Sequence, residues 1–183
     1  MPTDEQMQAA RAQWHWRGQA RPDFAVVPQP GQVSVWDYPR PPRLVADTRE
    51  VVVRWGTLEI ARSSRCILVQ ETAHPPSFYI PWADVDRQWL VAAQGGSICE
   101  WKGPARYWSL HANGQQLPNI AWSYPQPLPE ANALADCVAF YPAQLQCTVA
   151  GAPVQPQPGG FYGGWITPEL VGPFKGVPGS TGW

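Results

Sequence analysis

The sequence has 183 residues, which suits a single domain with attached extensions and is long enough to bury a substantial core. Charged residues make up 15% of the chain and the formal net charge is -1, so we expect no basic surface for binding nucleic acid. The polar start of the chain lacks the apolar centre of a signal peptide, and no apolar run is long enough to span a bilayer, so we expect a cytoplasmic protein without a membrane partner.

The N-terminal part of the chain predicts a helix followed by an extended arm. Residues 1–21 contain DEQMQAARAQW, a run of good helix formers that stops by Gly18. Residues 22–42 are rich in proline, which fixes φ and removes amide donors, so an extended conformation is expected there. Three apolar side chains of the arm require burial: Val35, Trp36 and Tyr38. We assign residues 1–43 to this helix and arm.

Residues 44–150 carry the regular β signals. EVVVRW and TLEIAR flank Gly56-Thr57 and predict a hairpin, and the segments CILVQE, SFYIPW, SICEWK and RYWSLH follow as strands. Asn113-Gly114 predicts a tight hairpin turn because both residues tolerate positive φ. PLPEANALAD predicts a short helix, after which CVAFY and QCTVA resume the strands. The expected fold class is mainly β, with antiparallel sheets and one short helix.

Residues 151–183 form a tail that is rich in glycine and proline, as is the whole chain, with 16 glycines and 22 prolines. Such a backbone does not favour a long helix. The tail nevertheless carries large apolar side chains, namely Phe161, Tyr162, Trp165, Ile166 and Phe174. We therefore expect it to pack against the core domain.

The four cysteines, Cys66, Cys99, Cys137 and Cys147, stand apart in the sequence. They form no C-x-x-C pair and none has a neighbouring histidine, whereas a structural zinc site usually draws on two close-spaced pairs of ligands. We expect four unpaired thiols, no metal site and no cofactor.

Residues 99–127 contain three tryptophans and two tyrosines in a short polar segment: Trp101, Tyr107, Trp108, Trp122 and Tyr124. These rings either fill a core or line a site. A strict hairpin at Asn113-Gly114 pairs Trp108 with Asn119 and places Trp122 on the opposite face of the sheet. One residue inserted near Pro118 exchanges the faces and brings the two tryptophans together. The sequence leaves both arrangements open.

Four segments, RCILVQETAHPPSFYIPWADV, CEWKGPARYW, AWSYPQPLPEA and VAFYP, resemble a bacterial family known as domain of unknown function 427. The resemblance runs from about Glu50 to Cys147. It implies a β-rich fold of the β-tent kind, which also houses methionine sulfoxide reductases of type B and the thalidomide-binding domain of cereblon. It implies no settled activity, and the nucleotidyltransferase label attached to the family lacks support here, because no Gly-Ser turn precedes the Asp84-x-Asp86 pair.

A looser resemblance concerns the tryptophans. In cereblon-type domains three tryptophans line a small cage, and their order and spacing are similar to those of Trp101, Trp108 and Trp122. The paired-cysteine zinc site of those domains is absent from this chain. The resemblance therefore implies the fold but not the ligand, and the cage is a hypothesis. Aromatic faces attract cations and stack on planar groups, so a flat or cationic ligand is expected.

The candidate ligand-binding residues are Trp101, Trp108, Trp122, Tyr107, Glu71 and His74. His74 is either a turn residue that bonds to local backbone or an acid, base or orienting partner of Glu71. Cys99 is either a buried structural thiol or a nucleophile near Lys102.

Three functions remain open from the sequence. The first is binding of a small molecule of unidentified structure in an aromatic pocket. The second is an enzyme that uses Glu71 and His74 or Cys99, and the third is an interaction module that presents the proline-rich arm or the tail. The sequence specifies neither the ligand nor the oligomeric state.

Overall fold

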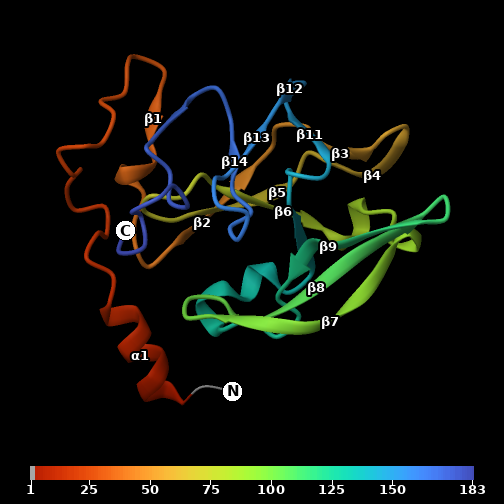
Figure 1. Ribbon diagram of the computed structural model, residues 1–183, viewed down its shortest axis with the longest axis horizontal. Helices are drawn as coiled ribbons and strands as arrows, with labels where there is room; N and C mark the ends of the chain where they lie inside the picture. Colours follow the sequence, from red (N-terminus) through yellow and green to blue (C-terminus); the bar gives the residue numbers. More distant parts are fainter. Residues whose placement is uncertain (1–2) are drawn as a thin grey trace.

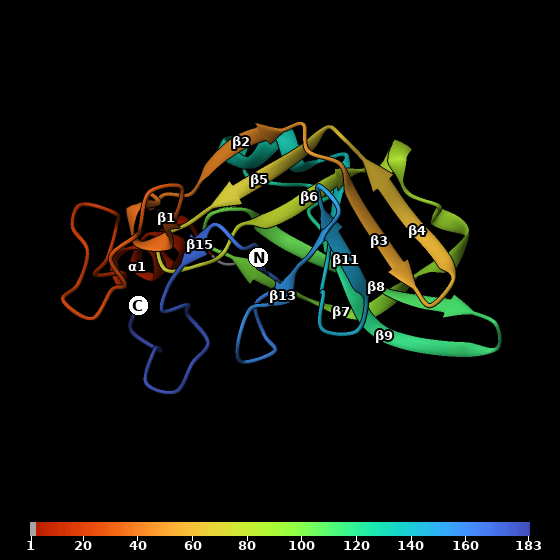
Figure 2. The same cartoon turned by 90° about the horizontal axis from the view of Figure 1, so that it is seen from above.

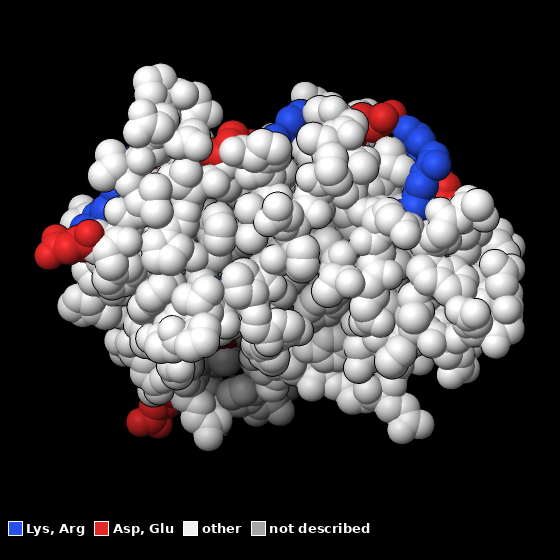
Figure 3. Space-filling view, turned by 45° about the horizontal axis from the view of Figure 1, so that its top comes forward, with Lys and Arg blue, Asp and Glu red and all other residues white. Residues whose placement is uncertain are grey.

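A computed structural model describes residues 3–183 (Figure 1). The fold is mainly β, as predicted, with two large antiparallel sheets and one α-helix. Charged side chains are sparse on the face drawn in Figure 3, and most lie along its rim.

The larger sheet has seven strands in the order β2-β5-β6-β10-β9-β8-β7. Their bounds are β2 Arg43–Asp47, β5 Cys66–Gln70, β6 Ser77–Pro81, β7 Leu90–Cys99, β8 Gly103–Ala112, β9 Gln115–Ser123 and β10 Cys137–Phe140. The predicted turn at Asn113-Gly114 joins β8 to β9, and both residues have positive φ. β7 begins well before the predicted segment SICEWK, because its first residues continue the pairing with β8 across a register shift between Ala92 and Gly96.

The second sheet has four strands in the order β12-β11-β3-β4. Their bounds are β3 Val51–Trp55, β4 Leu58–Ser63, β11 Gln146–Val149 and β12 Ala152–Pro153. The predicted hairpin at Gly56-Thr57 joins β3 to β4. Figure 2 shows this sheet lying across one end of the larger one, and their facing apolar side chains form the main core.

The helix α1, Asp4–Ala12, begins at a Thr3 cap whose side chain accepts from the Gln6 amide, while the Gln6 side chain bonds back to Thr3. It ends well before Gly18. The arm then contains β1, Val33–Ser34, and the 3-10 helix η1, Val35–Asp37. The three apolar side chains predicted to need burial, Val35, Trp36 and Tyr38, are buried.

The tail contains short strands, with bounds β13 Gln155–Pro156, β14 Trp165–Ile166 and β15 Leu170–Val171. The arm and the tail lie side by side because β1 pairs with β15 in parallel. Trp36 also donates its indole N–H to the Pro173 carbonyl, and its ring packs edge-on against Trp183. Trp165 is fully buried in the main core, whereas Phe161 is 67% exposed, so the tail packs on the core domain over most of its length.

Three further 3-10 helices complete the structure, with bounds η2 Trp82–Asp84, η3 Arg87–Trp89 and η4 Pro129–Leu134. The helix predicted from PLPEANALAD is η4. Residues 3–183 contain no helix with the length and apolar character needed to cross a bilayer.

Candidate functional site

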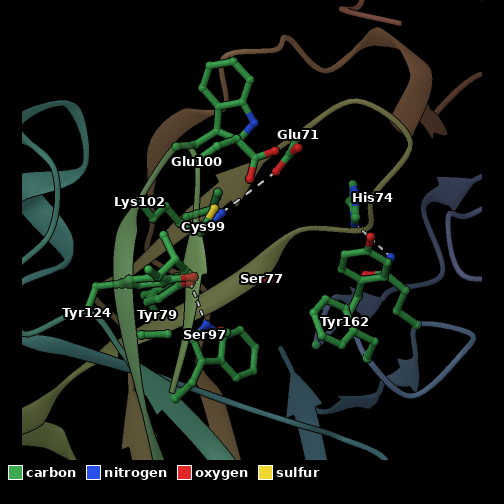
Figure 4. A pocket seen from close by; sticks show the side chains of 18 of the residues that line it. Glu71, His74, Ser77, Tyr79, Ser97, Cys99, Glu100, Lys102, Tyr124 and Tyr162 are labelled. Carbon is green, nitrogen blue, oxygen red and sulfur yellow. Dashed lines mark hydrogen bonds and ion pairs between the residues drawn. The ribbon is translucent and has the colours of Figure 1, made fainter. Parts of the chain in front are cut away.

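A cavity of about 200 Å³ lies on the face of the seven-stranded sheet that points away from the main core (Figure 4). Its floor and sides come from β5 to β9. The arm contributes Trp14, and the tail contributes Gln157, Phe161 and Tyr162. Segments far apart in the sequence therefore complete a single concavity.

Aromatic rings form much of the cavity wall, and most of them are tyrosines: Tyr79, Tyr107, Tyr124, Tyr141 and Tyr162, with Trp122 and Phe161. Their polar ends are partly engaged. The Trp122 indole donates to Tyr79 Oη at 2.9 Å, and Tyr107 Oη lies 2.8 Å from Ser97 Oγ. Burial raises the pKa of Tyr79 and Tyr124, so both hydroxyls stay neutral at physiological pH and serve as hydrogen-bonding groups.

A small group of buried charges lies at one side of the cavity. Glu71 accepts from Arg40 Nε at 3.0 Å, and Lys102 Nζ lies 3.9 Å from the other Glu71 oxygen. Burial alone would raise the pKa of Glu71, but its charge interactions with His74, Lys102 and Arg40 hold it below its usual value. Burial alone would lower the pKa of Lys102, but Cys99 and Glu71 hold it above its usual value. Glu71 is therefore an anion and Lys102 a cation at neutral pH.

His74 lies at the cavity edge at the end of a tight turn. Ala73, fully buried before it, has a φ of 69°, and the His74 amide donates to the Glu71 carbonyl. The Gln157 Oε1 atom accepts from the Gly164 amide, so the Gln157 amide nitrogen donates to His74 Nδ1 at 2.9 Å. Nδ1 is thus an acceptor, and Nε2 carries the hydrogen. Burial lowers the pKa of His74 to about 4, although Glu71 opposes this effect, so the ring is neutral at pH 7.

Glu71 and His74 therefore lie close together, but their side chains engage different partners. Glu71 bonds to Arg40, and His74 bonds to Gln157. No hydrogen bond joins the two side chains within the described part of the chain. This arrangement suits two groups that orient a ligand separately better than a proton-sharing pair.

All four cysteines are free thiols, and three of them are buried. Cys99 is the cysteine that lines the cavity. Its sulfur lies beside the Lys102 ammonium (Figure 4).

Trp101 is nine-tenths buried and lines the cavity. The Arg11 guanidinium of α1 sits over its ring, 5.0 Å from the centroid. Its indole N–H has no hydrogen-bond partner within residues 3–183, which is a costly state for a buried donor.

Trp108 does not join the other tryptophans, so the three-tryptophan cage is not formed. A register shift does occur near Pro118, but β9 gains two residues relative to β8 between the pairs Leu110–Leu117 and Trp108–Ala121. An even insertion leaves the alternation of faces unchanged, whereas a single inserted residue would have exchanged it. Trp122 therefore pairs with Tyr107 and faces the cavity, and Trp108 packs against the main core.

Trp108 is held there by its own contacts. Its indole donates to Ser123 Oγ at 2.9 Å, and its ring packs edge-on against Trp82. The other five candidate residues line the cavity: Glu71, His74, Trp101, Tyr107 and Trp122.

Several cavity residues were missing from the candidates drawn from the sequence: Trp14, Tyr79, Tyr124, Tyr141, Gln157 and Tyr162. One of them carried a usable signal. In SFYIPW, Tyr79 lies between Phe78 and Ile80, so strand alternation places it on the face opposite these two core residues. The tail residues carried none, because no periodicity links them to the sheet.

Within residues 3–183 no three His, Cys, Asp or Glu side chains are grouped in a way that could hold a metal ion. The polar groups that line the cavity can form hydrogen bonds and ion pairs.

A family described as Domain of unknown function (DUF427) matches residues 43–151. No curated protein matches the chain. The matched segment contains every strand of the seven-stranded sheet and also β3, β4 and β11. It excludes Trp14, Gln157, Phe161 and Tyr162, so residues outside the family match complete the cavity.

Proposed function

Because the chain belongs to the DUF427 family, whose description carries no activity, we propose a function from the cavity itself: the protein binds a small flat molecule there. The observation that carries the proposal is a concave site walled by tyrosine and tryptophan rings, with buried charged groups at one side. Ligand sites combine a mainly apolar or aromatic wall with a few convergent polar groups, and this cavity has both.

The size of the cavity limits the ligand. Its volume of about 200 Å³ is below the roughly 300 to 1,000 Å³ of sites for drug-sized molecules. A ligand with one or two rings fits this space. The rings of Trp122 and Tyr141, with centroids 4.5 Å apart, offer aromatic surface against which a planar group can pack.

The test uses two tryptophans from the same strand pair that face opposite sides. Phenol, benzamide and indole are titrated into the protein and followed by NMR shifts of the cavity residues. We expect binding of at least one probe, weakened by up to about 1.5 kcal/mol in Trp122→Phe, because the smaller ring offers less aromatic surface to the probe. The control, Trp108→Phe, should bind as the wild type does. Absence of any probe from the cavity, or equal weakening in both variants, contradicts the proposal.

A second candidate function is nucleophilic chemistry by Cys99. The observation that favours it is the position of its sulfur in the cavity beside the Lys102 ammonium, because reactive cysteines lie in partly exposed, electropositive surroundings. Iodoacetamide tests this: the sulfur forms a bond to the methylene carbon and iodide leaves. Alkylation of Cys99 should slow in Lys102→Met, and an unchanged rate contradicts a role for the cation.

We also propose that residues 44–150 form a β-tent-like core domain, with residues 1–43 and 151–183 as extensions packed on it. The family match supports this division, since it spans nearly the same residues. Expression of residues 44–150 alone, followed by thermal melting, tests whether this part folds independently.

A further inference from the structure

Lys102 is a cavity residue with unused hydrogen-bonding capacity. Its side chain is only 14% exposed. Its ammonium lies 3.9 Å from Glu71, which is beyond hydrogen-bond distance, beside the Cys99 sulfur and 5.9 Å from the centroid of the Tyr124 ring. An ammonium group has three donors, so these three neighbours leave it incompletely paired in a largely buried position. A buried charge of this kind is stabilised by a partner that brings the opposite charge.

The neighbouring charges are already engaged with each other. Glu71 bonds to Arg40, whose guanidinium also donates to the carbonyls of Trp16 and Thr72. The Glu100 carboxylate accepts from the Trp14 indole at 2.6 Å.

Lys175 differs from Lys102 in that its donors are occupied. Its ammonium donates to the carbonyls of Ser180 and Thr181 and to the main-chain oxygen of Trp183, at 3.0 to 3.1 Å. The ring of Trp14 also lies 4.8 Å from its nitrogen. Lys175 therefore fixes the end of the tail, and Lys102 is the ammonium that remains for a ligand.

A second donor lies across the cavity. Gln157 occupies His74 Nδ1, so the remaining ring hydrogen of His74 is on Nε2. Nε2 has no hydrogen-bond partner within the described residues. Among these residues, Trp101 Nε1 is the unpaired side-chain atom that is fully buried, so His74 Nε2 keeps some accessible surface and is open to the cavity. A neutral donor and a cation at the same site both favour an acceptor group on the ligand.

We propose that the ligand is a small flat molecule bearing an oxyanion, such as a carboxylate, and that Lys102 pairs with that oxyanion. This inference rests on the proposed binding function and adds the sign of the ligand's charge. An anionic ligand replaces the cationic ligand expected from a box of three tryptophans. The reason is that Trp108 is absent from the cavity, whereas the incompletely paired ammonium of Lys102 faces it. The planar part of the ligand packs on the aromatic wall, and the oxyanion lies toward Lys102.

Three probes of nearly equal shape and different charge test the proposal: benzoate, benzamide and benzamidine. NMR titration of the full chain at pH 7 should give about tenfold or more tighter binding for benzoate than for benzamide, as expected for a charge-assisted hydrogen bond. Benzamidine should bind most weakly. Because this comparison uses the wild-type protein, its outcome does not depend on the folding of a variant.

Variants identify the residue responsible. Lys102→Met keeps the aliphatic stem, and we expect it to abolish the preference for benzoate, whereas Lys102→Arg should retain it. The matched control is Arg106→Met, which removes one positive charge from an exposed position on β8 that does not line the cavity. It should leave the preference unchanged.

The outcomes separate the two proposals. Benzamide or benzamidine binding in the cavity as tightly as benzoate overturns the oxyanion and leaves the binding function standing. A benzoate preference that survives in Lys102→Met overturns the role of Lys102. Failure of all three probes to bind, together with phenol and indole, overturns the binding function and this inference with it.

Discussion

The two faces of the seven-stranded sheet differ in composition, although the same strands build both. Along β6, Phe78 and Ile80 point into the main core and Tyr79 points to the cavity side, and along β10, Val138 and Phe140 alternate with Cys137 and Ala139 in the same way. The core face is mainly aliphatic, with Phe78, Phe140 and Trp108 as aromatic members. The cavity face carries tyrosines, Trp122 and the buried ion pairs.

Because of this difference, adjacent residues on one strand contribute to different properties, one to the stability of the fold and the next to ligand binding. An apolar face gains stability by excluding water, whereas the cavity face keeps polar atoms that a ligand can use. Neighbouring residues on one strand therefore provide natural controls for each other. The predictions below use such pairs.

The largest effect is expected from the core face. Phe78 is almost fully buried, and its ring stacks on Trp165 at a centroid distance of 5.0 Å. Phe78→Ala should lower the free energy of unfolding by about 3 to 5 kcal/mol because it removes apolar contacts and leaves a cavity. Tyr79→Phe, one residue away, leaves the buried Trp122 indole without its acceptor and should cost less, about 1 to 3 kcal/mol. Urea unfolding measures both, and equal losses would contradict the division between the faces.

A pH effect is expected from the cavity face. The pKa of His74 is lowered from 6.5 to about 4 by burial, with Glu71 opposing and Arg40, Lys102 and Lys175 adding to the shift. Between these values the unfolded chain binds more protons than the folded chain, so stability rises with pH and is lost as pH falls from 6.5 to 4. The loss from this residue should reach as much as about 3 kcal/mol.

Urea unfolding between pH 4 and pH 7 tests this effect. His74→Gln should flatten the pH dependence, and the exposed His15→Gln serves as the control. A slope that is the same in wild type and His74→Gln would show that other groups cause it.

The contact between the tail and the cavity face gives a third prediction. A Cβ atom added to Gly163 would collide with the Trp122 ring, whereas one added to Gly182 meets no atom within 4 Å. Gly163→Ala should destabilise the protein by about 1 to 3 kcal/mol through overpacking, and it should shift the NMR signal of the Trp122 indole. Gly182→Ala should do neither. A Gly163→Ala variant with wild-type stability would mean that the tail does not press on Trp122.

The sequence was sufficient for the parts of the fold that local signals determine. The turns at Gly56-Thr57 and Asn113-Gly114 were predictable because turn residues separate two alternating runs. The early start of β7 was not, because its pairing with β8 crosses an irregularity near Gly96 that the local pattern does not reveal.

The cavity could be predicted only in part, for two physical reasons. Whether Trp122 faces Trp108 depends on the number of residues inserted at the bulge near Pro118, and the sequence shows that a break occurs but not whether one or two residues are added. Trp14 and Tyr162 reach the cavity from segments on either side of the sheet-forming sequence, and no periodicity relates them to its strands.

The smallest effect on stability, and the finest comparison of the two faces, comes from the cysteines. Cys66 on β5 and Cys147 on β11 of the four-stranded sheet both pack in the main core, whereas Cys137 and Cys99 lie on the cavity face. Burial raises the pKa of Cys66 and of Cys137 to about 11 and raises that of Cys147 further, so these three thiols should react slowly with iodoacetamide at neutral pH. Cys99 is less buried and lies beside Lys102 in the cavity, so it should be alkylated first.

Peptide mass spectrometry after brief labelling gives the order of reaction. Cys99→Ser should change the free energy of unfolding by less than about 0.5 kcal/mol, as expected for a partly exposed site, while removing the fast reaction. Benzoate should protect Cys99 from alkylation if it occupies the cavity, because the sulfur and the ammonium lie side by side. Cys137 lies on the same face but is buried beneath η4. Early labelling of Cys137 would show that the whole cavity face opens to solvent. The reactivity of Cys99 would then be explained by exposure and not by Lys102.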